Sequence, residues 1–183
     1  MADAKQLIIE SPTHGTFTVL YDAEDHDKVS AHRWRAQKDS KNKDKFYVRT
    51  NIPHPAGGWY CSPNGHKRRR RTILQIHRLI MDAPKGMDVD HINGNPLDNR
   101  KSNLRICTHA ENQRNRGANK NNTSGYKGVS WHKRNKKWAC QIKHNYKKIH
   151  VGNYATPEEA ARAYDKKAKE LHGEYAYLNF PDE

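Results

Sequence analysis

The chain has 183 residues, with 34 lysines and arginines against 20 aspartates and glutamates, which gives a formal net charge of +14. This length allows one ordinary domain or two to three small ones, and the charge favours a polyanionic partner such as nucleic acid. The sequence has no long apolar span, signal peptide or basic anchor helix, which excludes a membrane protein and predicts a cytoplasmic one.

The positive charge is concentrated in the middle and at the C-terminal end of the chain. Residues 1–66 carry 9 basic and 8 acidic side chains, and residues 67–123 carry 13 and 5. Residues 124–183 carry 12 and 7. We therefore expect the last two segments to make most of the contacts with a polyanion.

The first segment, residues 1–66, is predicted to be β-rich. Extended runs at 7–9 and 16–20 flank a Pro/Gly turn, and residues 45–52 form a further strand pattern. Residues 53–66 are rich in Pro, Gly and Asn, which is typical of a loop or a hairpin tip.

Five consecutive basic residues, 67–71, precede a predicted strand at 72–76. Such a run can be a solvated face or a targeting signal. Its position shortly before the candidate active site, the Asp-His pair described next, favours a clamp for phosphates. The arginines of this predicted clamp are Arg68, Arg69, Arg70 and Arg71.

A carboxylate and an imidazole stand side by side near the middle of the chain. Asp90 and His91 end a short apolar strand, and a turn-rich loop follows them. A carboxylate oxygen suits Mg²⁺ or Mn²⁺, and an imidazole with an ordinary pKa of about 6.5 can take a proton from an attacking water. A lone Asp-His pair is more often a surface hydrogen bond than a site, so the neighbouring residues decide whether this pair is a functional site.

A capped helix behind a short strand at 104–107 supplies those surroundings. Thr108 and Glu111 have the spacing of a capping box, which fixes the start of a helix and places Asn112 in its first turn. An amide oxygen at that point can join the carboxylate on one divalent cation. Such a cation stabilises the charge that grows on a phosphate and on the departing oxygen.

Residues 117–124 are polar, rich in Asn and Gly, and predicted to be a linker. The linker is either a plain spacer or a segment that follows a DNA groove and folds on binding. Beyond it, residues 125–181 predict three strands and a helix. That helix has a capping box at Thr156 and Glu159 and a small apolar face, which leaves one basic face of the sheet free.

Residues 73–116 resemble the HNH nuclease motif in its homing-endonuclease form, a ββα-metal finger. The resemblance implies that Asp90 and Asn112 are metal ligands and that His91 is the general base. Asn103 would be the central Asn of the motif, whose amide bonds the loop backbone and holds His91 in place.

Two further histidines could take part in this site. His109 is close to Asn112 in sequence and is its rival as a ligand, because other HNH nucleases often have a histidine there. We favour Asn112, which stands one turn into the helix. His77 could contact phosphate, or it could pack or form a hydrogen bond behind the site.

Residues 125–181 resemble an AP2 domain over nearly their whole length, in the runs 125–129, 137–143, 151–154 and 156–165. The resemblance implies a sheet lying in the major groove. The family's contact positions, together with the outward-facing residues of the alternating strands, give the expected DNA contacts. These are Lys127, Ser130, His132, Arg134, Gln141, Lys143, Lys148 and His150. Several of these positions are Arg in the plant transcription-factor form, so the plant target sequence does not transfer.

The expected fold class is α+β: a β-rich DNA-holding segment at 1–66, a ββα-metal finger at 67–116, and an AP2 three-stranded antiparallel sheet packed on one helix at 125–181. This combination resembles phage or mobile-intron homing endonucleases. We expect a monomer, without an obligate protein partner, that hydrolyses double-stranded DNA with one Mg²⁺ or Mn²⁺, by nicking or by a double-strand cut. Its place would be the bacterial cytoplasm if a phage encodes it. The alternative is a non-catalytic DNA-binding regulator of AP2 type.

Overall fold

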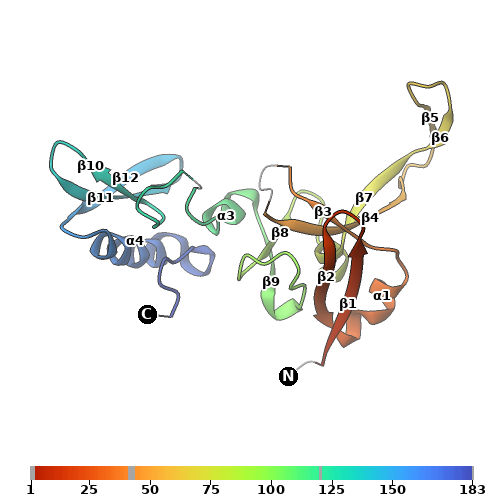
Figure 1. The fold of residues 1–183 in the computed structure, drawn as a ribbon, viewed down its shortest axis with the longest axis horizontal. Coiled ribbons are helices and arrows are strands. Elements are labelled where there is room, and N and C mark those ends of the chain that lie inside the picture. The colour runs from red at the N-terminus through yellow and green to blue at the C-terminus, as the bar shows by residue number, and fades with distance from the viewer. Residues whose placement is uncertain (1–2, 41–43, 120, 183) are drawn as a thin grey trace. The chain divides into compact units, whose positions relative to one another are not determined.

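The computed structural model describes residues 3–40, 44–119 and 121–182. The chain forms two compact units, Met1–Cys107 and Thr108–Glu183 (Figure 1). Short antiparallel sheets and short helices make up both units, so the predicted α+β class is confirmed. Within the described ranges, no helix is long and apolar enough to cross a membrane.

The first unit consists of short strands joined by turns and short helices. Its strands are β1 (Ala4–Ser11), β2 (Gly15–Asp22), β3 (Arg35–Lys38), β4 (Phe46–Pro53), β5 (Trp59–Cys61), β6 (Lys67–Arg69), β7 (Arg71–Gln75), β8 (Asp88–His91) and β9 (Leu104–Cys107). Its helices are η1 (Ala23–Asp25), α1 (His26–Ser30), α2 (Ile76–Ile80) and η2 (Lys101–Asn103). The strands pair as β1-β2, β3-β4-β7, β5-β6 and β8-β9, all antiparallel.

One hydrophobic core joins the N-terminal strands to the strands around residue 90. Val19, Val48, Ile76 and Leu104 belong to the same buried cluster although they are far apart in the sequence. Strand β4, which lies in the predicted N-terminal segment 1–66, also pairs with β7, which lies beyond it. The β-rich N-terminal segment is therefore part of the same folded body as the Asp-His pair.

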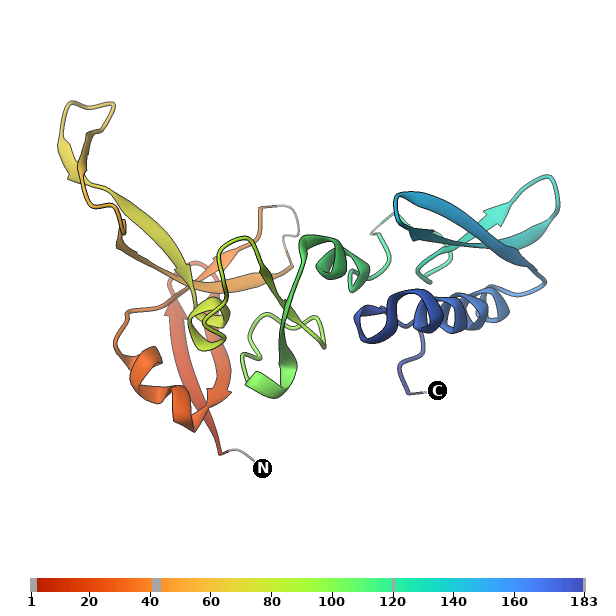
Figure 2. The ribbon, with the colours of Figure 1, turned by 180° about the vertical axis from the view of Figure 1, so that it is seen from behind.

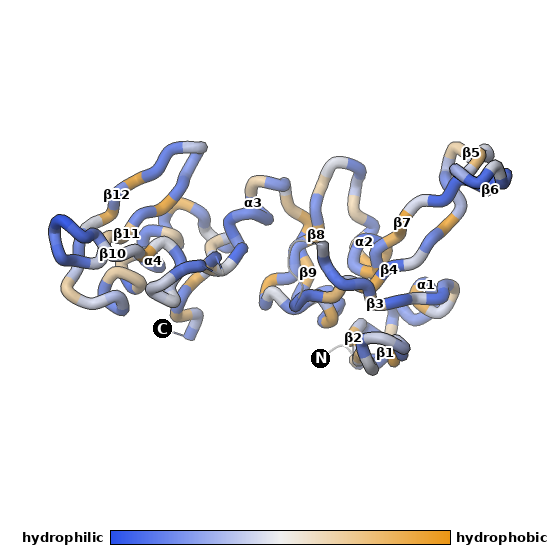
Figure 3. Tube along the Cα trace, turned by 45° about the horizontal axis from the view of Figure 1, so that its top comes forward, coloured by the Kyte–Doolittle hydropathy of each residue, from blue (hydrophilic) through white to orange (hydrophobic). Residues whose placement is uncertain are grey.

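The ribbon β5-β6 projects from the rest of the first unit and carries Lys67 to Arg69 of the basic run (Figures 1 and 3). Its aromatic side chains are unusually open, since Trp59 is 55% exposed and Tyr60 is 46% exposed. The guanidinium carbon of Arg69 lies 5.3 Å from the centre of the Trp59 ring. The loop at 53–66 is thus a hairpin tip, one of the two predicted forms.

The second unit begins with helix α3 (His109–Arg114) and continues into a three-stranded sheet with one long helix. Its other elements are β10 (Val129–His132), β11 (Lys137–His144), β12 (Lys147–Tyr154), α4 (Pro157–His172) and η3 (Gly173–Tyr175). The sheet order is β10-β11-β12, and α4 packs against it (Figure 2). This is the sheet-on-helix arrangement predicted for residues 125–181.

Small residues bring α4 close to the sheet. Ala160, Ala161 and Ala168 are fully buried against it, and Thr156 with Glu159 forms the predicted capping box. Gly128 has a positive φ of 77°, and a side-chain carbon there would overlap the ring of Tyr164. Only glycine suits a position that combines this backbone conformation with such a close approach.

The packing of a ββα finger stays a prediction. Strands β8 and β9 pair, and α3 follows β9 directly in the sequence. Helix α3, however, belongs to the second unit, whereas both strands belong to the first.

Candidate functional site

Asp90 and His91 are buried at the end of β8, where β9 pairs with it. Asp90 is 7% exposed and His91 is 6% exposed. The register places Arg105 directly across from Asp90, and its Nε and Nη2 lie 3.0 and 2.7 Å from Asp90 Oδ2. A guanidinium at this distance forms a hydrogen-bonded ion pair with the carboxylate, so the position already attracts positive charge.

Asn99 holds the imidazole of His91 in one orientation. Its Oδ1 lies 3.1 Å from His91 Nε2, while its Nδ2 donates to the carbonyl oxygen of Pro96 at 3.3 Å. The amide oxygen is therefore the acceptor, and His91 Nε2 is the donor. In the neutral ring the lone pair then lies on Nδ1, which is the atom that can accept a proton.

The surroundings of His91 keep it neutral. Burial lowers the pKa of His91 below its ordinary value, although the Asn99 hydrogen bond and the nearby Asp90 charge partly oppose this effect. A neutral imidazole at pH 7 is the form that acts as a base. The environment thus suits the predicted role of His91.

His77 lies behind the pair as a second buried ring. It is 5% exposed, and its ring meets that of His91 edge-on at 5.0 Å between centroids. Burial, together with the positive charge that His91 can carry, lowers the pKa of His77 to about 3. A neutral ring in this place packs against His91, which is one of the two roles that the sequence left open.

Asn103 ties together the loop that follows His91. Its Oδ1 accepts from the backbone N–H of Asn93 at 3.0 Å, and its Nδ2 donates to the carbonyl oxygen of Asp98 at 2.8 Å. These are the loop-backbone bonds that its predicted scaffold role requires. The direct partner of His91 is Asn99, which no sequence motif singles out, because its complete burial has no sequence signal of its own.

The loop is also bonded to the N-terminal hairpin. Leu20 of β2 donates its N–H to Leu97 O at 2.8 Å and accepts from Asn99 N at 2.7 Å. The carboxylate of Asp22 accepts from Lys101 N at 2.7 Å. The hairpin thus positions the residue that orients His91.

Asn112 stands in the first turn of a well-capped helix. Thr108 Oγ1 accepts from Glu111 N at 3.3 Å, and the Glu111 carboxylate accepts from Thr108 N at 2.8 Å, which confirms the predicted capping box. His109, the rival ligand, is the first residue of the same helix. Asp90 and Asn112 belong to different units, so their joint binding of one cation is part of the proposal below.

The donors fit a hard divalent cation. Asp90 offers a carboxylate that holds a guanidinium in this structure, and Asn112 offers an amide oxygen. Such oxygens are ligands that Mg²⁺ and Mn²⁺ prefer. Among the residues that the structure describes, no three His, Cys, Asp or Glu side chains gather at one point.

The free face of the AP2-like sheet carries most of the predicted DNA contacts. The exposed members of that set are Ser130, His132, Arg134, Gln141, Lys143, Lys148 and His150. Trp131, which is 46% exposed, meets Trp138 edge-on at 5.2 Å. Arg68 to Arg71 of the predicted clamp are exposed; Arg68 and Arg69 belong to the ribbon β5-β6, and Arg71 begins β7.

Lys127 is placed differently from the rest of that set. It is half-buried, its Nζ donates to the carbonyl oxygen of Arg114, and the same atom lies 5.2 Å from the centre of the Tyr177 ring. Burial and the charge of Arg116 lower the pKa of Lys127 to about 8. Its ammonium group therefore lies among residues of the second unit, next to the C-terminus of α3.

Two family models match this chain: HNH endonuclease over residues 76–114 and AP2 domain over residues 124–174. Protein 3.8 of Escherichia phage T7 is 39% identical over 111 residues, which cover 61% of this chain and 91% of that protein. An uncharacterized HNH endonuclease of Acanthamoeba polyphaga mimivirus is 36% identical over 128 residues, 66% of each chain. An ethylene-responsive transcription factor of Arabidopsis thaliana is 44% identical over 59 residues, 31% of this chain and 32% of that protein. No solved structure matches.

Proposed function

This chain belongs to the HNH endonuclease family and carries an AP2 domain at its C-terminal end, and on that premise we propose that it is a site-specific DNA endonuclease of the homing type. The observation that carries the proposal is the buried Asp90-His91 pair within the matched residues 76–114. Asp90 is ion-paired with Arg105, and His91 is held neutral with its lone pair on Nδ1.

In this proposal Asp90 and Asn112 would hold one Mg²⁺ or Mn²⁺ ion, which would supply positive charge for the scissile phosphate and the departing oxygen. His91 Nδ1 takes the proton of the attacking water. Asn99 keeps the ring in the tautomer that this step needs, and Asn103 keeps the loop in shape. The burial of the pair keeps bulk water from screening these charges.

DNA is held by two further surfaces of the chain. The exposed arginines of the ribbon supply phosphate contacts, which add affinity but carry no sequence information. The free face of β10-β11-β12 supplies base contacts in the major groove. One catalytic pair in a monomer predicts a nick in one strand, with a double-strand cut requiring two successive events.

Cleavage of supercoiled plasmid carrying the target region tests the proposal. We expect conversion to open circle in Mg²⁺ and none in EDTA, and a loss of about 10²–10⁴-fold in rate for His91→Ala, the usual worth of a general base. Full activity of His91→Ala would refute the assignment. His32→Ala changes a half-exposed histidine in the same unit and is the matched control.

Two observations favour a second function, a DNA-binding regulator that does not cut. Arg105 already neutralises Asp90, and the AP2 domain alone resembles plant transcription factors. In that case the protein would bind its DNA site with equal affinity in EDTA and Mg²⁺ and would leave the plasmid supercoiled. Both measurements use the same purified full chain.

A further inference from the structure

The second unit contains a small polar pocket between the end of α3 and the start of β10. Its volume is about 250 Å³. The lining residues are Gln113, Arg116, Gly117, Ala118, Asn119, Asn122, Lys127 and Gly128. This volume is below the usual range for a cofactor or drug-sized ligand, roughly 300–1,000 Å³, and suits a small group.

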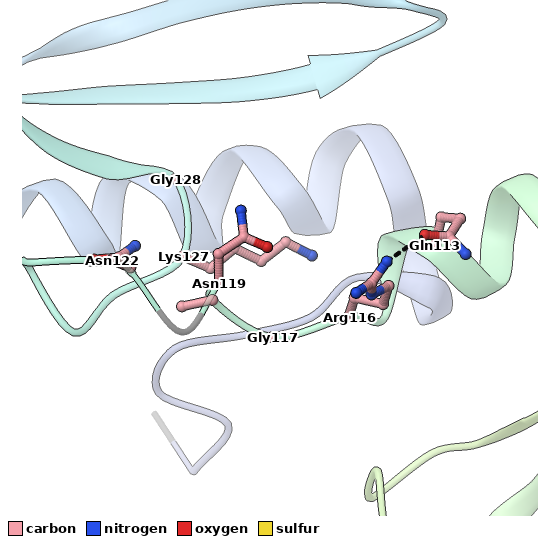
Figure 4. Close-up of a pocket in the computed structure, with 8 residues that line it drawn as sticks. Gln113, Arg116, Gly117, Asn119, Asn122, Lys127 and Gly128 are labelled. Atoms are coloured by element: carbon pink, nitrogen blue, oxygen red, sulfur yellow. Dashed lines mark hydrogen bonds between the residues drawn. The ribbon is translucent and has the colours of Figure 1, made fainter. Parts of the chain in front are cut away.

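Two cationic side chains, Lys127 and Arg116, line this pocket. Figure 4 shows Lys127 extending toward Arg116 with Asn119 beside it, and the Arg116 guanidinium turned to Gln113. Gln113 Oε1 accepts from Arg116 Nη1 at 3.1 Å, which fixes one edge of the guanidinium. Among the described lining residues there is no carboxylate, so the two positive charges face a space without an acidic partner in the lining.

This arrangement destabilises the charged form of Lys127. Burial and the charge of Arg116 both disfavour its ammonium form, and they lower its pKa to about 8. One of its three donors bonds the carbonyl oxygen of Arg114, which leaves two for another partner. An anion between the two cations would remove their repulsion and accept hydrogen bonds from both.

We propose that this pocket binds a phosphate group of the DNA backbone, with Arg116 and Lys127 holding the same phosphate. The inference rests on the proposed DNA-binding function and adds Arg116, from the segment that joins α3 to the sheet, to the predicted contact Lys127. Phosphate contacts set the position of a protein on DNA. The pocket thus fixes where α3, which carries Asn112, stands along the DNA backbone relative to the reading sheet of its own unit.

The backbone of this segment is held in place by its own hydrogen bonds. Asn122 Nδ2 donates to Tyr126 O at 2.7 Å, and Asn122 Oδ1 accepts from Ser124 N at 2.8 Å. Lys127 N donates to Asn179 Oδ1 at 2.7 Å. The Lys127 side of the pocket is therefore preorganised, which lowers the entropy cost of gripping a phosphate.

Salt dependence of DNA binding by the full-length His91→Ala protein in EDTA tests the proposal without cleavage. Each lost phosphate contact reduces the slope of log K against log salt by roughly 0.9. We expect this reduction of the slope for Arg116→Gln and for Lys127→Met. The double variant should show the same reduction and not twice as much, because both side chains hold one phosphate. Lys166→Gln removes an equal charge from the exposed face of α4 and should leave the slope unchanged.

The outcomes distinguish a DNA phosphate from a free anion, and they distinguish failure of this inference from failure of the proposed function. The amide resonances of Gly117 and Gly128 are followed while inorganic phosphate is added at constant ionic strength. We expect inorganic phosphate to shift these resonances only weakly. Strong shifts there with unchanged DNA slopes would overturn the DNA assignment in favour of a free anion. Slopes that fall by the same amount in Lys166→Gln would also overturn it. A protein that binds no DNA at all would instead refute the proposed function.

Discussion

Replacing Arg105 by Met tests whether Asp90 is a metal ligand. Arg105 and Asp90 form a nearly buried ion pair, with side chains 11% and 8% exposed. Removing one partner of a buried pair leaves an uncompensated charge and costs about 3–5 kcal/mol of stability. We therefore expect Arg105→Met to unfold at a lower urea concentration than the unaltered protein when both are in EDTA.

Magnesium should then restore part of that loss. A ligand that binds only the folded state stabilises it by RT ln(1 + [L]/Kd), which is about 2.7 kcal/mol at a hundredfold excess over Kd. If Asp90 is a ligand, the ion would have to compete with the guanidinium for it in the unaltered protein, whereas in Arg105→Met it would not. The stabilisation by Mg²⁺ should therefore be larger in the variant by at least about 1 kcal/mol.

The assay is amide hydrogen exchange of Asp88 and Cys107 in increasing urea, because the register and the bond from Ile92 N to Asn103 O make these two residues a hydrogen-bonded pair of β8 and β9. Arg100→Met is the matched control, since Arg100 holds Asp98 at 2.8 and 2.7 Å in the same loop region. It should lose stability in EDTA without any Mg²⁺-dependent recovery. Equal Mg²⁺ effects in both variants would refute the idea that Asp90 binds the cation.

Two further predictions concern the side chains around His91. Asn99→Ala frees the imidazole to adopt the other tautomer, so kcat should fall by about 10-fold to 10²-fold while the KM for DNA changes little; single-turnover cleavage measures both, and an unchanged kcat would contradict the orientation argument. His77 has its pKa lowered from 6.5 to about 3, so the unfolded chain binds the proton first as pH falls. Its contribution to stability is complete above pH 6.5 and is lost as pH drops toward 3, at up to about 1.4 kcal/mol per pH unit. Urea unfolding of His77→Phe should accordingly depend less on pH between 6.5 and 4 than that of the unaltered protein, and parallel curves would show that His77 is not buried as a neutral ring.

The sequence by itself determined the features that depend on local spacing. The capping boxes at Thr108 and Thr156 follow from the identity of residues three positions apart, and both are present. The alternation in β11 and β12 identified the exposed face of the sheet, because side-chain direction in a strand has a period of two. The side-by-side Asp90 and His91 needed only their order in the chain.

Only the tertiary structure decided which distant groups surround those residues. The pairing of β8 with β9 brings Arg105 to Asp90, and the packing of the N-terminal hairpin against the loop brings Asn99 to His91. Lys127 is turned toward Arg116 because the chain between α3 and β10 folds back on its own unit. Register and long-range packing determine these contacts, and no local pattern contains them, because burial depends on residues far away in the sequence.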